Sequence, residues 1–96
     1  MLRIIKRPLA RQDLIDIWRY TEETWGERQA DIYLDELDAG IRQLLNNPKL
    51  GRDRSDVRPG YRSLSIKQHT VFYTLDEDLI RVVRVLHARM DPDTRL

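Results

Sequence analysis

The first half of the chain carries two stretches in which core-type residues recur with the period of an α-helix. In the first stretch these positions are Ala10, Leu14, Ile17, Trp18, Thr21 and Trp25. In the second they are Ala30, Tyr33, Leu34, Leu37, Ile41, Leu44 and Leu45. Spacings of three and four place such side chains on one face of a helix. Gly26 lies between the stretches and is typical of a helix end, so the pattern predicts a hairpin of two antiparallel helices.

Shorter runs of β-branched and aromatic residues lie on both sides of this hairpin. Residues 2–6 precede it and end before Pro8, which suits the first turn of a helix because its missing N–H would be unpaired there. Three further runs follow at 61–67, 69–75 and 79–86. Short polar connections between them predict three antiparallel strands. The last two runs are almost continuously apolar, which predicts interior positions in the sheet.

The order of these elements predicts the fold class. Residues 49–59 contain few apolar side chains and are expected to form an exposed loop, while the residues from Met90 onward have no assigned structure. A strand, an antiparallel two-helix hairpin and a three-stranded antiparallel sheet predict an α+β fold with two layers. In that arrangement the hairpin covers one face of the sheet. We expect one domain over residues 1–96, because a single core is usually built from about 100 to 200 residues.

Composition narrows the possible classes of protein. The chain is 41% hydrophobic and 34% charged, and no run approaches the roughly 20 apolar residues of a membrane span. It has no cysteine, which excludes disulfides and thiolate metal sites, and only two histidines, His69 and His87. Its four glycines are scattered and form no phosphate-binding loop. We therefore expect a cytoplasmic domain without cofactor, metal ion or membrane contact.

The charges are unevenly distributed along the sequence. The formal net charge is +1, but residues 9–48 carry four arginines and nine acidic residues, whereas residues 49–67 carry six basic and two acidic ones. A basic surface attracts anionic partners. The alternative is that these arginines are solvated or paired with nearby acids, which is the normal state of a protein surface.

Arginine and histidine are the residue types with the most suggestive positions. Arg58, Arg62, Arg81 and Arg84 lie in or beside the predicted strands, and His87 ends the last one. Arginine binds phosphate through a fixed fork of donors, and a histidine beside it could act as a general acid in RNA cleavage. Alternatively, Arg81 and Arg84 pair with helix acids or with Asp78, and His87 packs at a strand end.

Two tryptophans lie on the apolar face of the first predicted helix, which also carries Leu14. Trp18 is at the middle of this helix and is expected in the core. Trp25 is at its end, beside Gly26, where it is expected to be partly exposed and to mark a contact surface.

Five segments together resemble a known family. They are LARQDLIDIWRYTEETWG (9–26), NNPKLGR (46–52), RPGYRSL (58–64), HTVFYTL (69–75) and RVVRVLHARMD (81–91). In this order they are similar to ParE toxins of the RelE/ParE superfamily, over essentially the whole chain. The resemblance implies a toxin of a type II toxin–antitoxin system that inhibits DNA gyrase and is not an enzyme. It also implies a ParD-type antitoxin as partner, a hetero-oligomer with that antitoxin, and contact with operator DNA only through it.

The resemblance does not transfer a list of functional residues, so the site residues are hypotheses. The expected antitoxin-binding residues are Leu14, Trp18 and Trp25. The expected residues for toxicity and target binding are Arg58, Arg62, His87, Arg89 and Met90.

Two alternatives remain open at this point. RelE-type relatives are ribosome-dependent mRNA endonucleases, and Arg62, Arg84 and His87 would then be the catalytic residues. This sequence lacks the lysine-rich middle and the C-terminal tyrosine common in those enzymes, since its last tyrosine is Tyr73. The other alternative is a degenerate member that only represses its operon together with its antitoxin.

Overall fold

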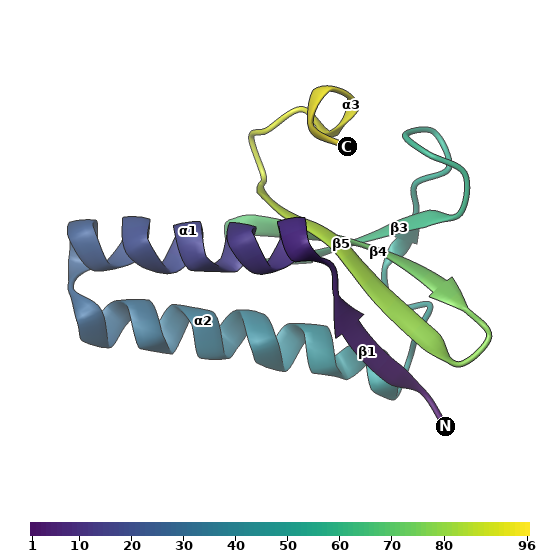
Figure 1. Cartoon of the computed structure of the whole chain (residues 1–96), viewed down its shortest axis with the longest axis horizontal. Helices are drawn as coiled ribbons and strands as arrows, with labels where there is room; N and C mark the ends of the chain where they lie inside the picture. Colours follow the sequence, from purple (N-terminus) through teal and green to yellow (C-terminus); the bar gives the residue numbers. More distant parts are fainter.

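The predicted helical hairpin is present in the computed structural model, which describes residues 1–96. Helix α1 spans Pro8–Trp25 and α2 spans Glu27–Arg42, continued by a short 3-10 turn at Gln43–Leu45. Pro8 lies in the first turn of α1, as its missing N–H favours. Gly26 alone joins the helices with a φ of +94°, which residues with a Cβ rarely adopt. Figure 1 shows the two helices lying side by side.

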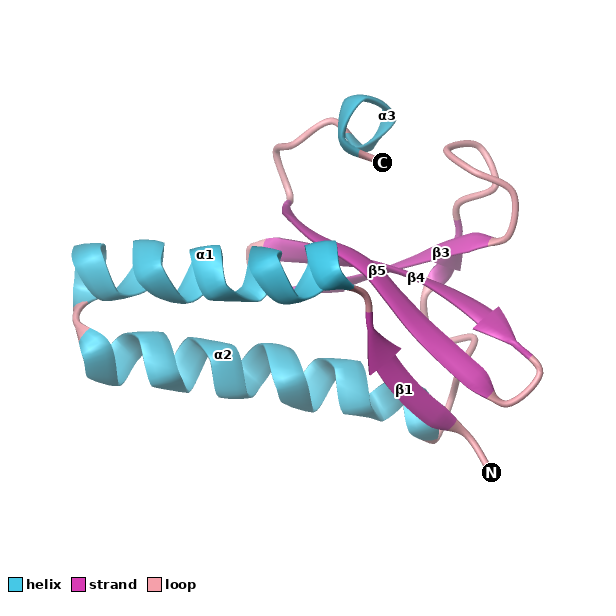
Figure 2. Cartoon of the chain, viewed as in Figure 1, coloured by secondary structure: helices cyan, strands magenta, loops and turns pink.

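The second layer is a sheet with the strand order β1-β5-β4-β3-β2. Its strands are β1 (Arg3–Lys6), β2 (Arg52–Asp53), β3 (Tyr61–Ile66), β4 (His69–Asp76) and β5 (Leu79–His87). Strands β3, β4 and β5 are antiparallel, and β4 and β5 have neighbours on both sides, which confirms their predicted interior positions. The α+β fold class is therefore confirmed (Figure 2).

The sheet also has two strands more than the three predicted to follow the hairpin. The N-terminal run pairs in parallel with β5, with Arg3 opposite Leu79, and so becomes one edge of the same sheet. The segment expected as a loop contains β2, two residues that pair with β3. Both pairings join segments distant in sequence, which hydrophobic periodicity does not reveal.

A β-bulge in β5 sets which residues face each other at the end of the sheet. Tyr73 lies opposite Val82, but Phe72 lies opposite Arg84, so Val83 is an extra residue. Beyond this bulge His69 lies opposite His87. Without the extra residue its partner would be Leu86, because a shift by one position changes every later pair.

The core lies between the hairpin and the sheet. Its buried apolar residues include Ala10, Ala30, Leu37, Ile41 and Leu44 from the helical part and Val71, Tyr73, Ile80, Val82 and Val85 from the strands. Leu14 and Ile17 are partly buried and pack against this cluster. Each fully buried aliphatic side chain contributes about 1.5 to 3 kcal/mol, so the apolar face of the hairpin fixes how it sits on the sheet.

The C-terminal segment leaves the end of β5 and forms one further turn of helix, α3 (Pro92–Arg95). The Asp91 side chain accepts a hydrogen bond from the Asp93 N–H and caps this turn. In Figure 1, α3 (yellow) stands apart from the hairpin beyond the end of β5. None of the helices is long and apolar enough to span a membrane.

Candidate functional site

An open groove of about 870 Å³ lies where the hairpin, the end of β5 and the C-terminal segment meet. Tyr20 and Trp25 of α1, Tyr33 of α2, His69 of β4, His87 of β5 and Met90 of the C-terminal segment are among its lining residues. Tyr20 and Trp25 are 69% and 72% exposed. Exposed aromatic side chains that gather along a groove are typical of a contact surface.

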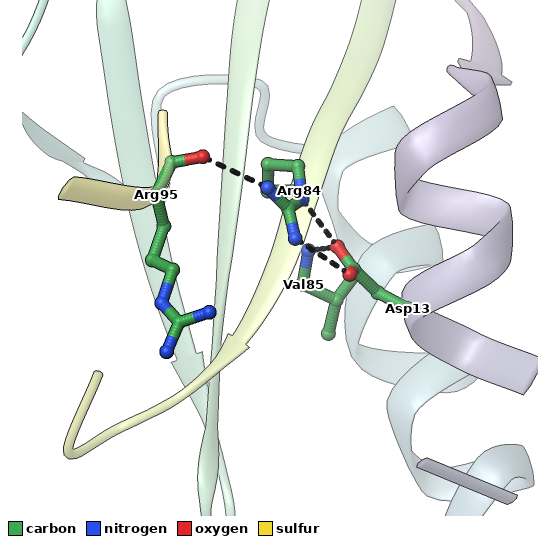
Figure 3. A network of polar contacts seen from close by, with 4 residues as sticks. All are labelled: Asp13, Arg84, Val85 and Arg95. Atoms are coloured by element: carbon green, nitrogen blue, oxygen red, sulfur yellow. Dashed lines mark hydrogen bonds and ion pairs between the residues drawn. The ribbon is translucent and has the colours of Figure 1, made fainter. Parts of the chain in front are cut away.

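One wall of the groove is fixed by an ion pair between α1 and β5 (Figure 3). Arg84 Nε donates to Asp13 Oδ2 at 2.8 Å and Arg84 Nη2 donates to Asp13 Oδ1 at 2.9 Å. Asp13 Oδ2 also accepts the Val85 N–H at 2.9 Å. Since β1 ends at Lys6, this part of the β5 edge has no neighbouring strand to accept its N–H groups. The Asp13 carboxylate accepts the Val85 N–H in place of a strand.

The same arginine holds the C-terminal segment. Arg84 Nη1 donates to the main-chain carbonyl of Arg95 at 2.8 Å, as Figure 3 shows. The hydrogen bonds from the guanidinium to Asp13 raise the pKa of Arg84. Pairing with a helix acid was one of the two roles that the sequence left open for Arg84, and it is the one that the structure shows. We refer to Asp13, Arg84, Val85 and Arg95 as the clasp.

The groove also contains both histidines of the chain. His69 and His87 are cross-strand neighbours, with ring centroids 5.4 Å apart and planes at 79°. The Tyr33 hydroxyl lies 2.6 Å from His69 Nδ1. Burial, and next the proximity of His87, lower the pKa of His69 to about 4, so this imidazole is neutral at pH 7. Burial likewise raises the pKa of the Tyr33 hydroxyl, which keeps its proton.

A second polar cluster lies away from the groove, around the loop 48–52. Arg62 Nε and Nη2 donate to the Gly51 carbonyl at 3.1 and 2.6 Å, and Nη2 also donates to the Lys49 carbonyl at 3.1 Å. The buried Tyr73 hydroxyl donates to the Pro48 carbonyl at 2.8 Å and accepts the Gly51 N–H at 3.0 Å. The side chains of Arg62 and Tyr73 therefore hold this loop to the sheet.

Only glycine fits at the centre of this loop. A Cβ on Gly51 would lie 2.7 Å from both the Ser63 carbonyl oxygen and the Tyr73 hydroxyl. The close approach lets β2 pair with β3, where Arg52 lies opposite Ser63.

The residues predicted for toxicity do not gather in one place. His87 and Met90 line the groove, and Arg89 is exposed next to them. Arg62 borders a separate, smaller cavity of about 180 Å³ beside the loop 48–52. Arg58 is exposed and donates to the main-chain carbonyl of Leu96.

The residues predicted for antitoxin binding also differ in their positions. Leu14 packs against the core. Trp18 is partly buried, and its indole N–H donates to Asp31 Oδ1 at 2.9 Å, which links α1 to α2. Trp25 is exposed and lines the groove. Of the three, Trp25 is the side chain placed where a partner has direct access.

Sequence reasoning gave no role to four residues that build the site. Asp13 is one of several acidic residues on the first helix, and its partner Arg84 is far away in the sequence. Tyr33 was expected simply as a core position, and Tyr20 lay outside the apolar pattern. His69 carried a usable signal, since the only two histidines lie in successive predicted strands of one β-hairpin.

The fold is shared with known toxins of toxin–antitoxin systems. The structure of the chromosomal ParDE toxin–antitoxin system from P. aeruginosa superposes with a TM-score of 0.81 at 18% identity, covering 91% of this chain and 96% of that one. The YoeB dimer from Staphylococcus aureus gives a TM-score of 0.63 at 20% identity, covering 90% and 95%. At such identities the likeness concerns the fold alone.

Sequence comparison narrows this class to one family. Residues 4–92 match the family described as the ParE toxin of the type II toxin–antitoxin system parDE, and the chain belongs to this family. Toxin ParE1 of Mycobacterium tuberculosis (strain ATCC 25618 / H37Rv) is 46% identical over 95 residues, covering 98% of this chain and 97% of the relative. Toxin ParE1 of Caulobacter vibrioides is 38% identical over 87 residues, covering 91% and 90%.

Proposed function

We propose that this chain is a toxin that inhibits DNA gyrase and that a ParD-type antitoxin neutralises it. The observation that carries the proposal is the match to the ParE toxin family over residues 4–92. Gyrase inhibition is the activity that the resemblance to ParE toxins implies. An antitoxin partner is in keeping with the structural likeness to a ParDE system.

The positions of the arginines favour inhibition over RNA cleavage. A RelE-type reaction would need Arg62, Arg84 and His87 around one phosphate. Arg84 is engaged by Asp13 and Arg95, and Arg62 by the carbonyls of the loop 48–52. Arg62 and His87 also border different cavities. A guanidinium that already donates to acceptors of its own chain is a poor phosphate ligand.

The groove suits an antitoxin segment that orders on binding. Tyr20 and Trp25 of α1, both exposed, offer apolar surface along this groove. Disordered segments gain affinity by burying apolar side chains in such grooves. In this proposal Trp25 contacts the antitoxin. Arg58 and Arg62 already donate to carbonyls of the chain, so the proposed contacts to the target are Arg89 and Met90.

A supercoiling assay tests the target. Purified gyrase, relaxed plasmid, ATP and antitoxin-free toxin should give loss of supercoiling and accumulation of cleaved plasmid. Addition of the purified antitoxin in excess should restore supercoiling. Undiminished supercoiling with a folded toxin would overturn the proposal, and mRNA cleavage on purified ribosomes would then establish the RelE-type activity in its place.

The double substitution of Arg89 and Met90 by alanine tests the target contacts in the same assay. Both side chains are exposed, so the protein should fold normally, and its inhibition of gyrase should fall. Arg28→Ala, which removes an exposed charge on α2, is the matched control and should leave inhibition unchanged.

A further inference from the structure

The hydrogen bonds around the two histidines determine which nitrogen of each ring carries the proton. The Gln68 N–H donates to the Tyr33 hydroxyl oxygen at 3.2 Å. An amide N–H cannot accept, so the acceptor available for the Tyr33 proton is His69 Nδ1, 2.6 Å away. His69 Nδ1 is therefore unprotonated, and its Nε2 carries the hydrogen of the neutral ring.

The same reasoning applies to His87. The main-chain N–H of Arg89 donates to His87 Nδ1 at 3.1 Å, so this nitrogen too is an acceptor. When neutral, His87 therefore also carries its proton on Nε2. The bulge at Val83 places the two imidazoles opposite each other. In both neutral rings the N–H group is at Nε2.

Neither Nε2 atom has a hydrogen-bond partner within the chain. The hydrogen bonds of the two rings all involve Nδ1. No buried side-chain nitrogen or oxygen lacks a partner, so both Nε2 atoms reach solvent, and both rings line the groove. The groove thus offers two neighbouring N–H donors on a surface that is otherwise rich in aromatic side chains.

We propose that the two Nε2–H groups of His69 and His87 bind a carboxylate of the antitoxin segment that occupies the groove. This rests on the proposed function, because it names the chemistry by which the antitoxin is recognised there. A carboxylate has two acceptor oxygens and matches two adjacent donors. Hydrogen bonds to an ionised acceptor are about twice as strong as neutral ones, and more so where a partner excludes water.

The surrounding charges allow a carboxylate at this position. The charged and titratable side chains near the two rings are Asp13, Asp16 and Tyr20 on α1, Tyr33 on α2, Arg84 on β5 and Arg95 on α3. Arg84 neutralises Asp13 in the clasp, and Arg95 offsets Asp16 in the overall charge of the groove. A metal ion is a poor alternative occupant, because both Nε2 atoms are protonated and would have to exchange tautomers to become ligands.

The contact needs only the Nε2–H groups of the two rings. A proton added to either ring would lie on Nδ1, where the Arg89 N–H and the Tyr33 hydroxyl already donate. The same two hydrogen bonds therefore keep Nε2 as the donor of each ring while the carboxylate is bound.

Titration calorimetry with this toxin and a purified ParD-type antitoxin tests this directly. His87→Leu removes the donor and should lower affinity roughly 10-fold or more near pH 7. His87→Gln keeps an N–H donor and should retain most of the affinity. Trp25→Ala is the control, because it should weaken binding to the same extent whether or not the antitoxin carboxylate is present.

The partner carboxylate is found by replacing each Asp and Glu of the antitoxin by Asn or Gln. One such replacement should lower the affinity about as much as His87→Leu does, and combining the two should cause no further loss of affinity. Long-range ¹H–¹⁵N spectra of the unmodified toxin provide a second readout that needs no variant. They should show both imidazoles of the free toxin protonated at Nε2, and the Nε2 signals should shift when the antitoxin binds.

The outcomes separate the two proposals. An antitoxin that fails to bind the folded toxin would refute the proposed partner itself. Tight binding that neither His87→Leu nor any of the antitoxin replacements weakens would overturn the carboxylate site and leave the toxin–antitoxin assignment standing. An Nδ1-protonated ring in the free toxin would overturn the proposal at its first step.

Discussion

Around the loop 48–52, the side chains of Arg62 and Tyr73 donate hydrogen bonds to carbonyl groups of the chain itself. In the groove, by contrast, the Nε2 atoms of His69 and His87 have no hydrogen-bond partner within the chain. Both regions contain polar side chains of the same small sheet. In the first, these side chains bind the main chain of the loop, whereas in the second their N–H donors are unpaired and accessible to a partner. The arginines were the most suggestive residues in the sequence, but the histidines are the ones with unused donors.

The difference separates stability from binding. Substitutions that unpair an internal donor or acceptor should change the free energy of unfolding, because a buried group is left without a partner. Substitutions of exposed groove residues should change affinity for a partner and leave stability nearly unaltered. The four predictions below test this separation in order of decreasing effect on stability.

Asp13→Ala should have the largest effect. It leaves the Arg84 guanidinium and the Val85 N–H without their acceptor, although the side chains of Asp13 and Arg84 are only 13% and 18% exposed. We expect a loss of about 3 kcal/mol in the free energy of unfolding, measured by urea denaturation. Asp16→Ala, on the same helix but exposed, should change it by less than about 0.5 kcal/mol. Equal effects of the two variants would show that the clasp is not a stabilising feature.

Tyr73→Phe should come next. It keeps the buried ring and removes only the hydroxyl that joins the Gly51 N–H to the Pro48 carbonyl. Because that N–H is buried, we expect a loss of about 2 kcal/mol in the same measurement. Tyr61→Phe removes a hydroxyl without a hydrogen bond within the chain and should be nearly neutral. A neutral Tyr73→Phe would mean that water takes over the role of the hydroxyl.

His69 should make stability depend on pH between about 4 and 6.5. Its pKa is about 4 in the folded protein and 6.5 as the ordinary value, so the unfolded chain binds more protons in this interval. Stability from this group is thus complete above pH 6.5 and is lost as the pH falls towards 4.

Because His69 is only partly buried, screening by solvent limits this contribution to about 1 kcal/mol. Urea denaturation of the unmodified protein and of His69→Gln across this interval measures it, since the other titrating groups are common to both. The difference between the two proteins should decrease on acidification. A constant difference would contradict the low pKa.

Trp25→Ala should have the smallest effect on stability. The side chain is 72% exposed, so the free energy of unfolding should change by less than about 0.5 kcal/mol. Its affinity for the antitoxin should nevertheless fall roughly 10-fold, because exposed tryptophans often dominate binding energy. Calorimetry and urea denaturation of the same preparation give both numbers. Unchanged affinity would remove Trp25 from the antitoxin site.

The sequence predicted those parts of the fold that depend on local pattern. The period of the apolar residues located the two helices, and the continuous apolar runs placed β4 and β5 in the sheet interior. It did not predict the parallel pairing of β1, because four residues contain no information about a partner at the other end of the chain.

The candidate site was less predictable for a related reason. Its contacts depend on register, and the bulge at Val83 decides that His69 faces His87. The pairing of Arg84 with Asp13 likewise joins the last strand to the first helix. From sequence, Arg84 could equally have been a phosphate ligand, because residue type alone does not tell whether a guanidinium is already paired.

The position of β5 has a consequence for the time at which the groove is completed. This strand is synthesised last, yet it lies in the interior of the sheet and is the only partner of β1, which is synthesised first. Contacts between the two ends of a chain carry a high cost in loop entropy, which only the completed core offsets. A nascent chain whose last strand is still inside the ribosome therefore lacks an interior strand of its sheet, one wall of its groove and the clasp. The groove is complete only when this strand has paired with both β1 and β4.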